Sequence, residues 1–113
     1  MPFDNPQVSE SKCTQALRAA FALISNEEGW VQGRNHVWSL DHTRIRYCSI
    51  GAINDMYGQF SAQSIMGAHQ CLLDVCPWRD IMAYNDSINH KELCIWWNKA
   101  IDWSIKRDNE LQQ

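Results

Sequence analysis

The sequence predicts a mainly α-helical domain with a minor β component, a compact unit of four to five helices and a short β-hairpin around residues 30–47. Apolar residues recur at three- and four-residue steps in three long stretches, whereas strand-like alternation is confined to one short segment. A chain of 113 residues with 45% hydrophobic and 20% charged residues has the size and composition of one globular domain. We therefore expect a single helical domain over residues 9–113, preceded by a flexible N-terminal arm over residues 1–8.

The first helix is expected over residues 9–26, where apolar side chains recur at helical spacing. These positions are Cys13, Leu17, Ala20, Phe21 and Ile24. Ser9 or Ser11 can act as the N-cap, because a serine side chain accepts a hydrogen bond from a free N–H of the first turn. We expect the helix to stop near Gly29, which readily adopts the left-handed conformation that ends many helices.

The segment 30–47 lacks a helical period, and its last four residues, 44–47, alternate like a strand. This pattern predicts a short hairpin or two extended arms. A second, short helix is expected over residues 48–57, where Gly51 and Ala52 are small enough to let it approach another element closely.

Two further helices are expected in the second half of the chain. Residues 61–76 carry a helical apolar stripe, which Pro77 ends. One or two helical turns over residues 77–84 and a polar turn at 85–87 should precede the last helix, over residues 89–107. The inward face of this last helix is expected to consist of Leu93, Trp97, Ala100, Ile101 and Ser104.

Charge and composition exclude several classes of protein. The net charge of −3 and the lack of any Lys/Arg run disfavour non-specific nucleic-acid binding. The sequence has no secretory signal and no apolar stretch of the roughly 20 residues that a membrane span needs, so we expect a cytoplasmic protein without membrane contact. Five cysteines, an odd number without a secretory signal, are expected to be free thiols.

Three short blocks carry a resemblance to a known family. They are residues 29–33 (Gly-Trp-Val-Gln-Gly), residues 47–52 (Tyr-Cys-Ser-Ile-Gly-Ala) and residues 84–86 (Tyr-Asn-Asp), with His90 four positions further on. In this order they resemble a family of small bacterial and phage proteins that is catalogued as a domain of unknown function. The resemblance implies a compact helical fold with a small β element and the cytoplasm of a bacterial host cell, and it implies no activity.

The candidate for catalysis is a thiol site formed by Cys48, His90 and Asp86. Cys48 is expected at a helix N-terminus, where the helix dipole and free N–H groups favour the thiolate. His90 would serve as its base, and Asp86 would orient the histidine. In the structural alternative, Cys48 packs in the interior. Asp86 then caps the last helix, and His90 lies exposed in its first turn.

No metal and no cofactor are expected. Cys71 and Cys76 are five positions apart on one helix, so their side chains point about 140° apart, whereas zinc ligands come in closely spaced pairs. The chain also contains no glycine-rich phosphate loop, no paired zinc-protease histidines and no exposed-serine motif. The common enzyme classes are therefore unsupported.

Gln32 and Asn85 are candidate binding residues, since both are polar members of the blocks that carry the resemblance. The favoured interpretation of residues 29–33 is a tight structural crossing in which Trp30 anchors the first helix. Contact of Gln32 with a ligand is the alternative.

The last helix carries the strongest indication of a binding surface. If Trp97 faces the core, Trp96 lies about 100° away and Trp103 shares the side of Trp96. Six tryptophans are many for this length, and tryptophan is typical of binding hot spots. Trp96 and Trp103 are therefore expected to meet a partner or a second copy, or else to be covered by residues 34–44.

These observations favour a non-enzymatic interaction protein of phage or mobile-element type. It would bind a bacterial protein or protein complex, or associate into a homo-oligomer. An inhibitor of a host defence system is the most specific form of this hypothesis. The alternative is a cysteine-dependent hydrolase or transferase that uses Cys48 with His90 and Asp86.

Overall fold

The computed structural model describes residues 10–111, and this part of the chain forms five α-helices and a two-stranded antiparallel sheet. The helices are α1 (Lys12–Ile24), α2 (Ser49–Asn54), α3 (Ala62–Asp74), α4 (Ile81–Asn85) and α5 (His90–Leu111). The sheet pairs β1 (His36–Trp38) with β2 (Ile45–Tyr47), and a 3-10 turn over Glu27–Gly29 follows α1. The mainly α-helical prediction with a hairpin within residues 30–47 is confirmed. The expected flexible arm, residues 1–8, lies outside the described residues.

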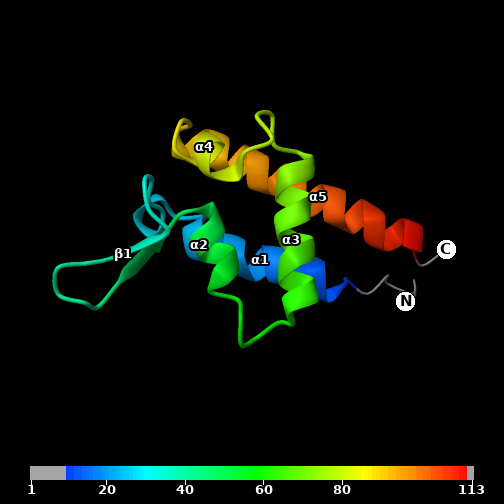
Figure 1. Cartoon of the computed structure of the whole chain (residues 1–113), viewed down its shortest axis with the longest axis horizontal. Helices are drawn as coiled ribbons and strands as arrows, with labels where there is room; N and C mark the ends of the chain where they lie inside the picture. Colours follow the sequence, from blue (N-terminus) through cyan, green and yellow to red (C-terminus); the bar gives the residue numbers. More distant parts are fainter. Residues whose placement is uncertain (1–9, 112–113) are drawn as a thin grey trace, which may run out of the picture.

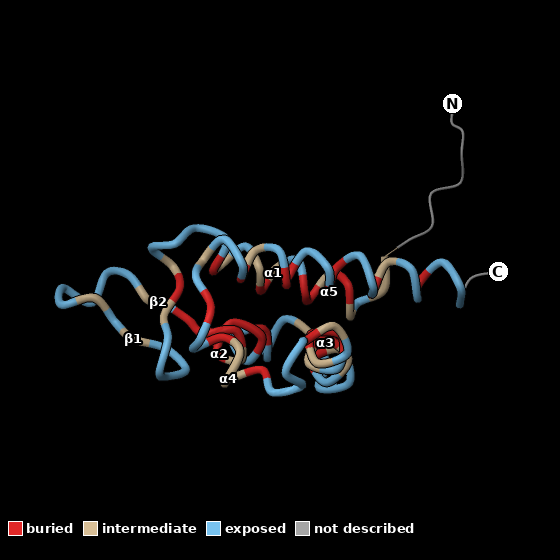
Figure 2. The backbone as a smooth tube through the Cα atoms, turned by 90° about the horizontal axis from the view of Figure 1, so that it is seen from above, coloured by how far each residue is buried: buried red, intermediate tan, exposed pale blue. Residues whose placement is uncertain are grey.

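The helices form two layers. In one layer α1 and α5 lie side by side and run in opposite directions (Figures 1 and 2). The second layer consists of α2, α3 and α4, and in it α3 crosses α1 at a steep angle (Figure 1). Buried residues face the space between the two layers, as the red segments in Figure 2 show. The hairpin extends away from the helices at one end of the molecule, beyond the C-terminal end of α1 (Figure 1).

Local sequence signals account for the starts of the helices. Ser11 is the N-cap of α1, and its hydroxyl accepts a hydrogen bond from the Thr14 N–H. Ser61 caps α3 in the same way. Each cap satisfies an N–H group that has no partner within the helix, and such a contact stabilises a helix by about 1 kcal/mol. The choice between Ser9 and Ser11 is thereby settled in favour of Ser11.

Two glycines are required by close backbone contacts. The expectation that Gly29 ends α1 in a left-handed conformation is wrong, because α1 ends at Ile24 and Gly29 does not have a positive φ. A Cβ at Gly29 would instead lie 2.1 Å from the Leu23 carbonyl oxygen. At Gly51 a Cβ would lie 1.9 Å from the Asn35 carbonyl oxygen, which confirms the predicted close approach of this helix to another segment.

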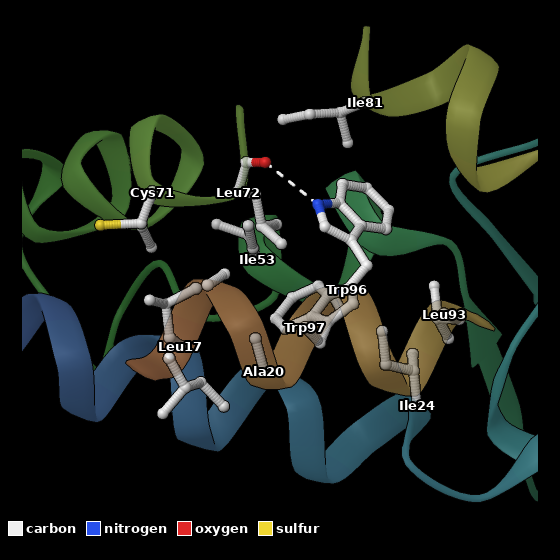
Figure 3. Packing of buried hydrophobic residues seen from close by; sticks show 14 of the residues in the cluster. Leu17, Ala20, Ile24, Ile53, Cys71, Leu72, Ile81, Leu93, Trp96 and Trp97 are labelled. Atoms are coloured by element: carbon white, nitrogen blue, oxygen red, sulfur yellow. Dashed lines mark hydrogen bonds between the residues drawn. The ribbon is translucent and has the colours of Figure 1, made fainter. Parts of the chain in front are cut away.

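The core lies between the two layers and is dominated by α1, α3 and α5. The five positions predicted for the inward face of α5 are all buried: Leu93, Trp97, Ala100, Ile101 and Ser104. Figure 3 shows Trp96 and Trp97 together with Leu17 of α1 and Leu72 of α3 in this interior. The interior therefore contains the indole rings of both Trp96 and Trp97, whereas the sequence pattern predicted only Trp97 there.

Candidate functional site

The three blocks that carry the family resemblance meet around one side chain, that of Asn85. It lies at the C-terminal end of α4 and is fully buried. Its Oδ1 accepts a hydrogen bond from the Trp30 indole N–H (2.9 Å). The same oxygen also accepts from the backbone N–H (3.0 Å) and the hydroxyl (2.8 Å) of Ser49. Asn85 therefore connects the segment after α1 with the start of α2.

The amino group of Asn85 is occupied as well. Nδ2 donates to the Val31 carbonyl oxygen (3.3 Å) and to the Asp86 carboxylate (3.0 Å). The Trp97 indole N–H extends the network by donating to the Ser49 hydroxyl (3.0 Å). Because a side-chain amide has two N–H donors and one carbonyl acceptor, these contacts use the hydrogen-bonding groups of Asn85. We interpret Asn85 as the residue that joins the three blocks rather than as a ligand contact.

On the surface side of this network, Gln32 links residues 29–33 to the residues at and after the end of α4. Its Nε2 donates to the carbonyl oxygens of Asn85 (3.0 Å) and Ile88 (2.8 Å). The neighbouring Gly33 N–H donates to the Asp86 carboxylate (2.9 Å). These contacts favour the predicted structural crossing. Gln32 also lines a surface groove of about 540 Å³, so its contact with a ligand stays a prediction.

Cys48 occupies the helix N-terminus that the sequence predicted. It is the N-cap of α2, and its sulfur accepts a hydrogen bond from the Gly51 N–H (3.3 Å). Burial nevertheless raises the pKa of the Cys48 thiol; the N–H groups of the helix offset this only in part, and the Asp86 carboxylate raises the pKa further. The environment of Cys48 therefore favours the neutral thiol over the nucleophilic thiolate.

His90 and Asp86 make their contacts elsewhere. Nε2 of His90 lies 2.7 Å from the Ile24 carbonyl oxygen at the end of α1. The sulfur of Cys48 lies 3.7 Å from that of Met82, and within residues 10–111 no hydrogen bond joins Cys48 to His90 or Asp86. The structure therefore does not assemble the three residues, because His90 begins α5 and turns toward α1. The enzymatic alternative stays a prediction that this geometry does not support.

The last helix is capped by Asn89 and not by Asp86, which corrects the structural alternative. The Asn89 side chain accepts from the Glu92 N–H (2.8 Å), and the Glu92 carboxylate accepts from the Asn89 N–H (3.2 Å). This reciprocal pair is a capping box. Asp86 instead ends α4, and His90 is half-buried rather than exposed.

The expectation that Trp96 belongs to a second, unpacked face of the last helix is wrong. Its ring is only 2% exposed, and its indole N–H donates to the Leu72 carbonyl oxygen (3.1 Å; Figure 3). The Tyr84 ring packs edge-on against it, with ring centroids 5.0 Å apart. The cover is thus supplied by α3 and α4, not by residues 34–44. Trp103 is 37% exposed, and its N–H donates to the Asp74 carboxylate (3.1 Å).

The hairpin carries exposed apolar side chains, although sequence reasoning treated it only as a cover for other residues. Trp38 is 51% exposed and Leu40, at the tip, is completely exposed. Trp38 is the last residue of β1, and Leu40 lies in the turn that follows it. Two large apolar residues in a short non-helical segment with three arginines were the signal that the sequence offered.

The tip of the hairpin is ordered by its own hydrogen bonds although it is exposed. Asp41 Oδ1 accepts from the Ser39 hydroxyl (2.6 Å) and from the N–H (3.1 Å) and hydroxyl (2.7 Å) of Thr43. These hydrogen bonds lower the pKa of the Asp41 carboxyl to about 2. A groove of about 420 Å³ runs beside the tip. It is lined by Glu28, Val37, Trp38, Ser39, Leu40, Arg44 and Arg46.

A buried polar cluster joins the start of α1 to the end of α5. The Asp108 carboxylate accepts from the Thr14 hydroxyl (2.7 Å) and from the Ser11 N–H (3.0 Å). The hydroxyls of Thr14 and Ser104 lie 2.6 Å apart. Burial acts to raise the pKa of Asp108, but these hydrogen bonds outweigh it and hold the pKa below its ordinary value.

Asp108 should make the stability of the domain depend on pH. Because the pKa of Asp108 is lower in the folded chain than in the unfolded chain, its carboxylate stabilises the fold at pH values above the ordinary pKa of 3.8. This contribution disappears as the pH falls through the lowered pKa. We expect Asp108→Asn to reduce the free energy of unfolding by about 1–2 kcal/mol near neutral pH, and by less below about pH 4. Urea unfolding over this pH range is the measurement. A reduction of equal size at every pH would contradict the expectation.

The fold and this site define a small helical domain in which a buried polar network around Asn85 joins the three blocks at residues 29–33, 47–52 and 84–86. The chain belongs to the family described as "Family of unknown function (DUF6197)", which matches residues 9–102. The predicted resemblance to a domain of unknown function is confirmed at this level. No curated protein and no solved structure matches the chain. Among the described helices, none combines the length and the apolar character that a membrane crossing requires.

Proposed function

We propose that this protein is a non-enzymatic binding protein that docks on a bacterial protein through its hairpin. The observation that carries the proposal is the exposure of Trp38 and Leu40, 51% and complete respectively, on an arm that extends away from the helices (Figure 1). A tryptophan loses little side-chain entropy on binding and buries a large area, which makes it typical of hot spots. The internal hydrogen bonds of the tip reduce the ordering cost further.

The charge of the hairpin indicates the chemistry of the partner. Residues 34–46 contain three arginines and one aspartate, whereas the whole chain has a net charge of −3. Arg44 is largely exposed, and the Glu28 carboxylate lies 3.6 Å from it, so its charge is only partly neutralised. An acidic protein surface with an apolar pocket complements this combination, since the arginines steer the approach and the tryptophan fills the pocket.

A protein is favoured over a nucleic acid as the partner. Leu40 at the tip has no role in phosphate contact, and the overall negative charge opposes the approach of a phosphate backbone. The family resemblance adds a phage or mobile-element source to the proposal, with a component of a host defence system as its most specific form. A second copy of the chain is the competing occupant, because the chain as a whole has a net charge of −3 whereas its hairpin is basic.

The test is partner capture with paired variants. The Trp38→Ser/Leu40→Ser double variant should keep the melting temperature, because both side chains are exposed, and should weaken binding of the captured bacterial protein about 30-fold or more. Trp78→Ser is the matched control, since Trp78 is 57% exposed but lies outside the hairpin. It should bind as the unchanged protein does.

Two outcomes would contradict the proposal. One is equal capture by the double variant and by Trp78→Ser, which would place the interface elsewhere. The other is a dimer in solution that the double variant converts to a monomer, which would make a second copy the occupant of the hairpin. The mass in solution and the affinity for the captured protein are therefore measured on the same preparations.

A further inference from the structure

Two thiols share a cavity at the end of the helical body opposite the hairpin. Cys13 lies in the first turn of α1 and Cys71 lies on α3, with its sulfur pointing away from the two core tryptophans (Figure 3). The cavity, of about 190 Å³, lies between α1, α3 and α5. Its lining consists of Ser11, Cys13, Gly67, Cys71, Ser104, Arg107, Asp108 and Leu111.

The packing of α1 against α3 places both thiols on the wall of this one cavity. A Cβ at Gly67 would lie 3.0 Å from the Cys13 sulfur, so the lack of a side chain there makes room for the thiol. Gly67 lies one helical turn before Cys71, on the same face of α3. The Ser104 hydroxyl donates to the Cys13 sulfur at 3.8 Å. Cys13 is half-buried at the mouth of the cavity, whereas Cys71 is only 1% exposed.

The two thiols differ in how readily they ionise. The neighbouring Cys13 thiol lowers the pKa of Cys71, with help from the Ser104 hydroxyl and the Arg107 charge, while burial and the Asp74 carboxylate act in the opposite direction. The neighbouring Cys71 thiol and burial raise the pKa of Cys13. Burial also raises the pKa of Cys94, a half-buried thiol on α5. The pair thus resembles a nucleophilic thiolate beside a second thiol.

We infer that Cys13 and Cys71 form a peroxide-sensitive dithiol whose oxidation links α1 to α3 by a disulfide. The ligand class is a small hydroperoxide, and hydrogen peroxide fits the cavity. Redox-sensing cysteines typically combine thiolate character with a neighbouring thiol that resolves the first oxidation product. The inference is independent of the hairpin and of the partner proposed for it.

The reaction proceeds in two balanced steps. The Cys71 thiolate attacks one oxygen of hydrogen peroxide, the O–O bond breaks, and the sulfenic acid and hydroxide result. This hydroxide takes up the proton that Cys71 released on ionising and becomes water. Cys13 then attacks the Cys71 sulfur, the S–S bond forms, and the hydroxide that leaves takes the Cys13 proton to become water. Overall, two thiols are oxidised to a disulfide while one hydrogen peroxide is reduced to two waters.

The first test counts thiols in the unchanged protein. Before treatment, the unfolded chain should titrate as five free thiols, and after stoichiometric hydrogen peroxide as three, because two of the five are consumed. The intact mass should fall by about 2 Da, and peptide mapping without reductant should recover the Cys13–Cys71 link. Dithiothreitol should restore all five thiols.

Single substitutions separate the two roles. Cys13→Ser should leave the sulfenic acid on Cys71, where dimedone traps it, because the resolving thiol is missing. Cys71→Ser should lower the initial rate of peroxide consumption at least about fivefold. Cys94→Ser is the matched control and should change neither result. The melting temperature of each variant establishes that it is folded.

Several results would overturn the inference. Five free thiols after treatment would show that no disulfide forms. A disulfide that maps to another pair, or dimedone label that spreads evenly over the cysteines of Cys13→Ser, would show that the cavity does not direct the reaction. If Cys71→Ser fails to fold, mapping in the unchanged protein and the dimedone result with Cys13→Ser still decide the question.

Discussion

Replacing Trp96 by alanine should lower the free energy of unfolding by about 3–5 kcal/mol, the range typical of truncating a buried aromatic residue. The ring is 2% exposed, and the substitution would leave a cavity where α3, α4 and α5 meet. It would also leave the Leu72 carbonyl oxygen without its indole donor. Since domains of this size are stable by only about 5–15 kcal/mol, the variant should be close to the limit of folding.

The decisive comparison is with Trp103, which shares the same helix and the same residue type. Trp103→Ala should cost less than about 1.5 kcal/mol, because the ring is 37% exposed and its hydrogen bond to Asp74 is accessible to water. Urea unfolding followed by circular dichroism measures both. Similar losses for the two variants would mean that Trp96 does not occupy the interior.

Replacing Asn85 by alanine should lower the free energy of unfolding by about 3–4 kcal/mol, although the side chain is polar. Its oxygen is the acceptor for the Trp30 indole and for both donors of Ser49, all in a buried environment. Each buried donor left without an acceptor costs about 1–3 kcal/mol, and partial rearrangement keeps the sum below the simple total. Because Trp30 is one of the six tryptophans and is part of the network, the tryptophan emission of the protein should shift to longer wavelength even where the variant remains folded.

Two further asparagine substitutions serve as controls. Asn98→Ala removes only a hydrogen bond to the Cys94 carbonyl oxygen on the exposed side of α5, and should change the stability by less than about 0.5 kcal/mol. Asn85→Asp keeps the acceptor oxygen but removes the donor to Val31 and places a carboxylate beside Asp86, so it should also destabilise the fold. If Asn85→Ala stays within about 1 kcal/mol of the unchanged protein, the network does not hold the three blocks together.

The sequence by itself determined the helices and the hairpin. Helical spacing of apolar residues located α1, α3 and α5, and the capping chemistry of serine narrowed the start of α1 to Ser9 or Ser11. These signals act over three or four residues, so they do not depend on what the rest of the chain does. The close approach of α2 to another segment at Gly51 could also be predicted, because the lack of a side chain is a property of that residue alone.

Only the tertiary structure decided which side chains meet. The helical period correctly placed Trp96 about 100° from Trp97 on α5. It could not show that α3 and α4 cover Trp96, because the arrangement of the layers depends on contacts between residues that are distant in sequence. The same holds for Cys48 and His90, whose partners lie on other elements, and for the pairing of Cys13 with Cys71 across α1 and α3. Periodicity specifies the direction of a side chain from its own helix, whereas burial, partner and pKa depend on what the fold places in that direction.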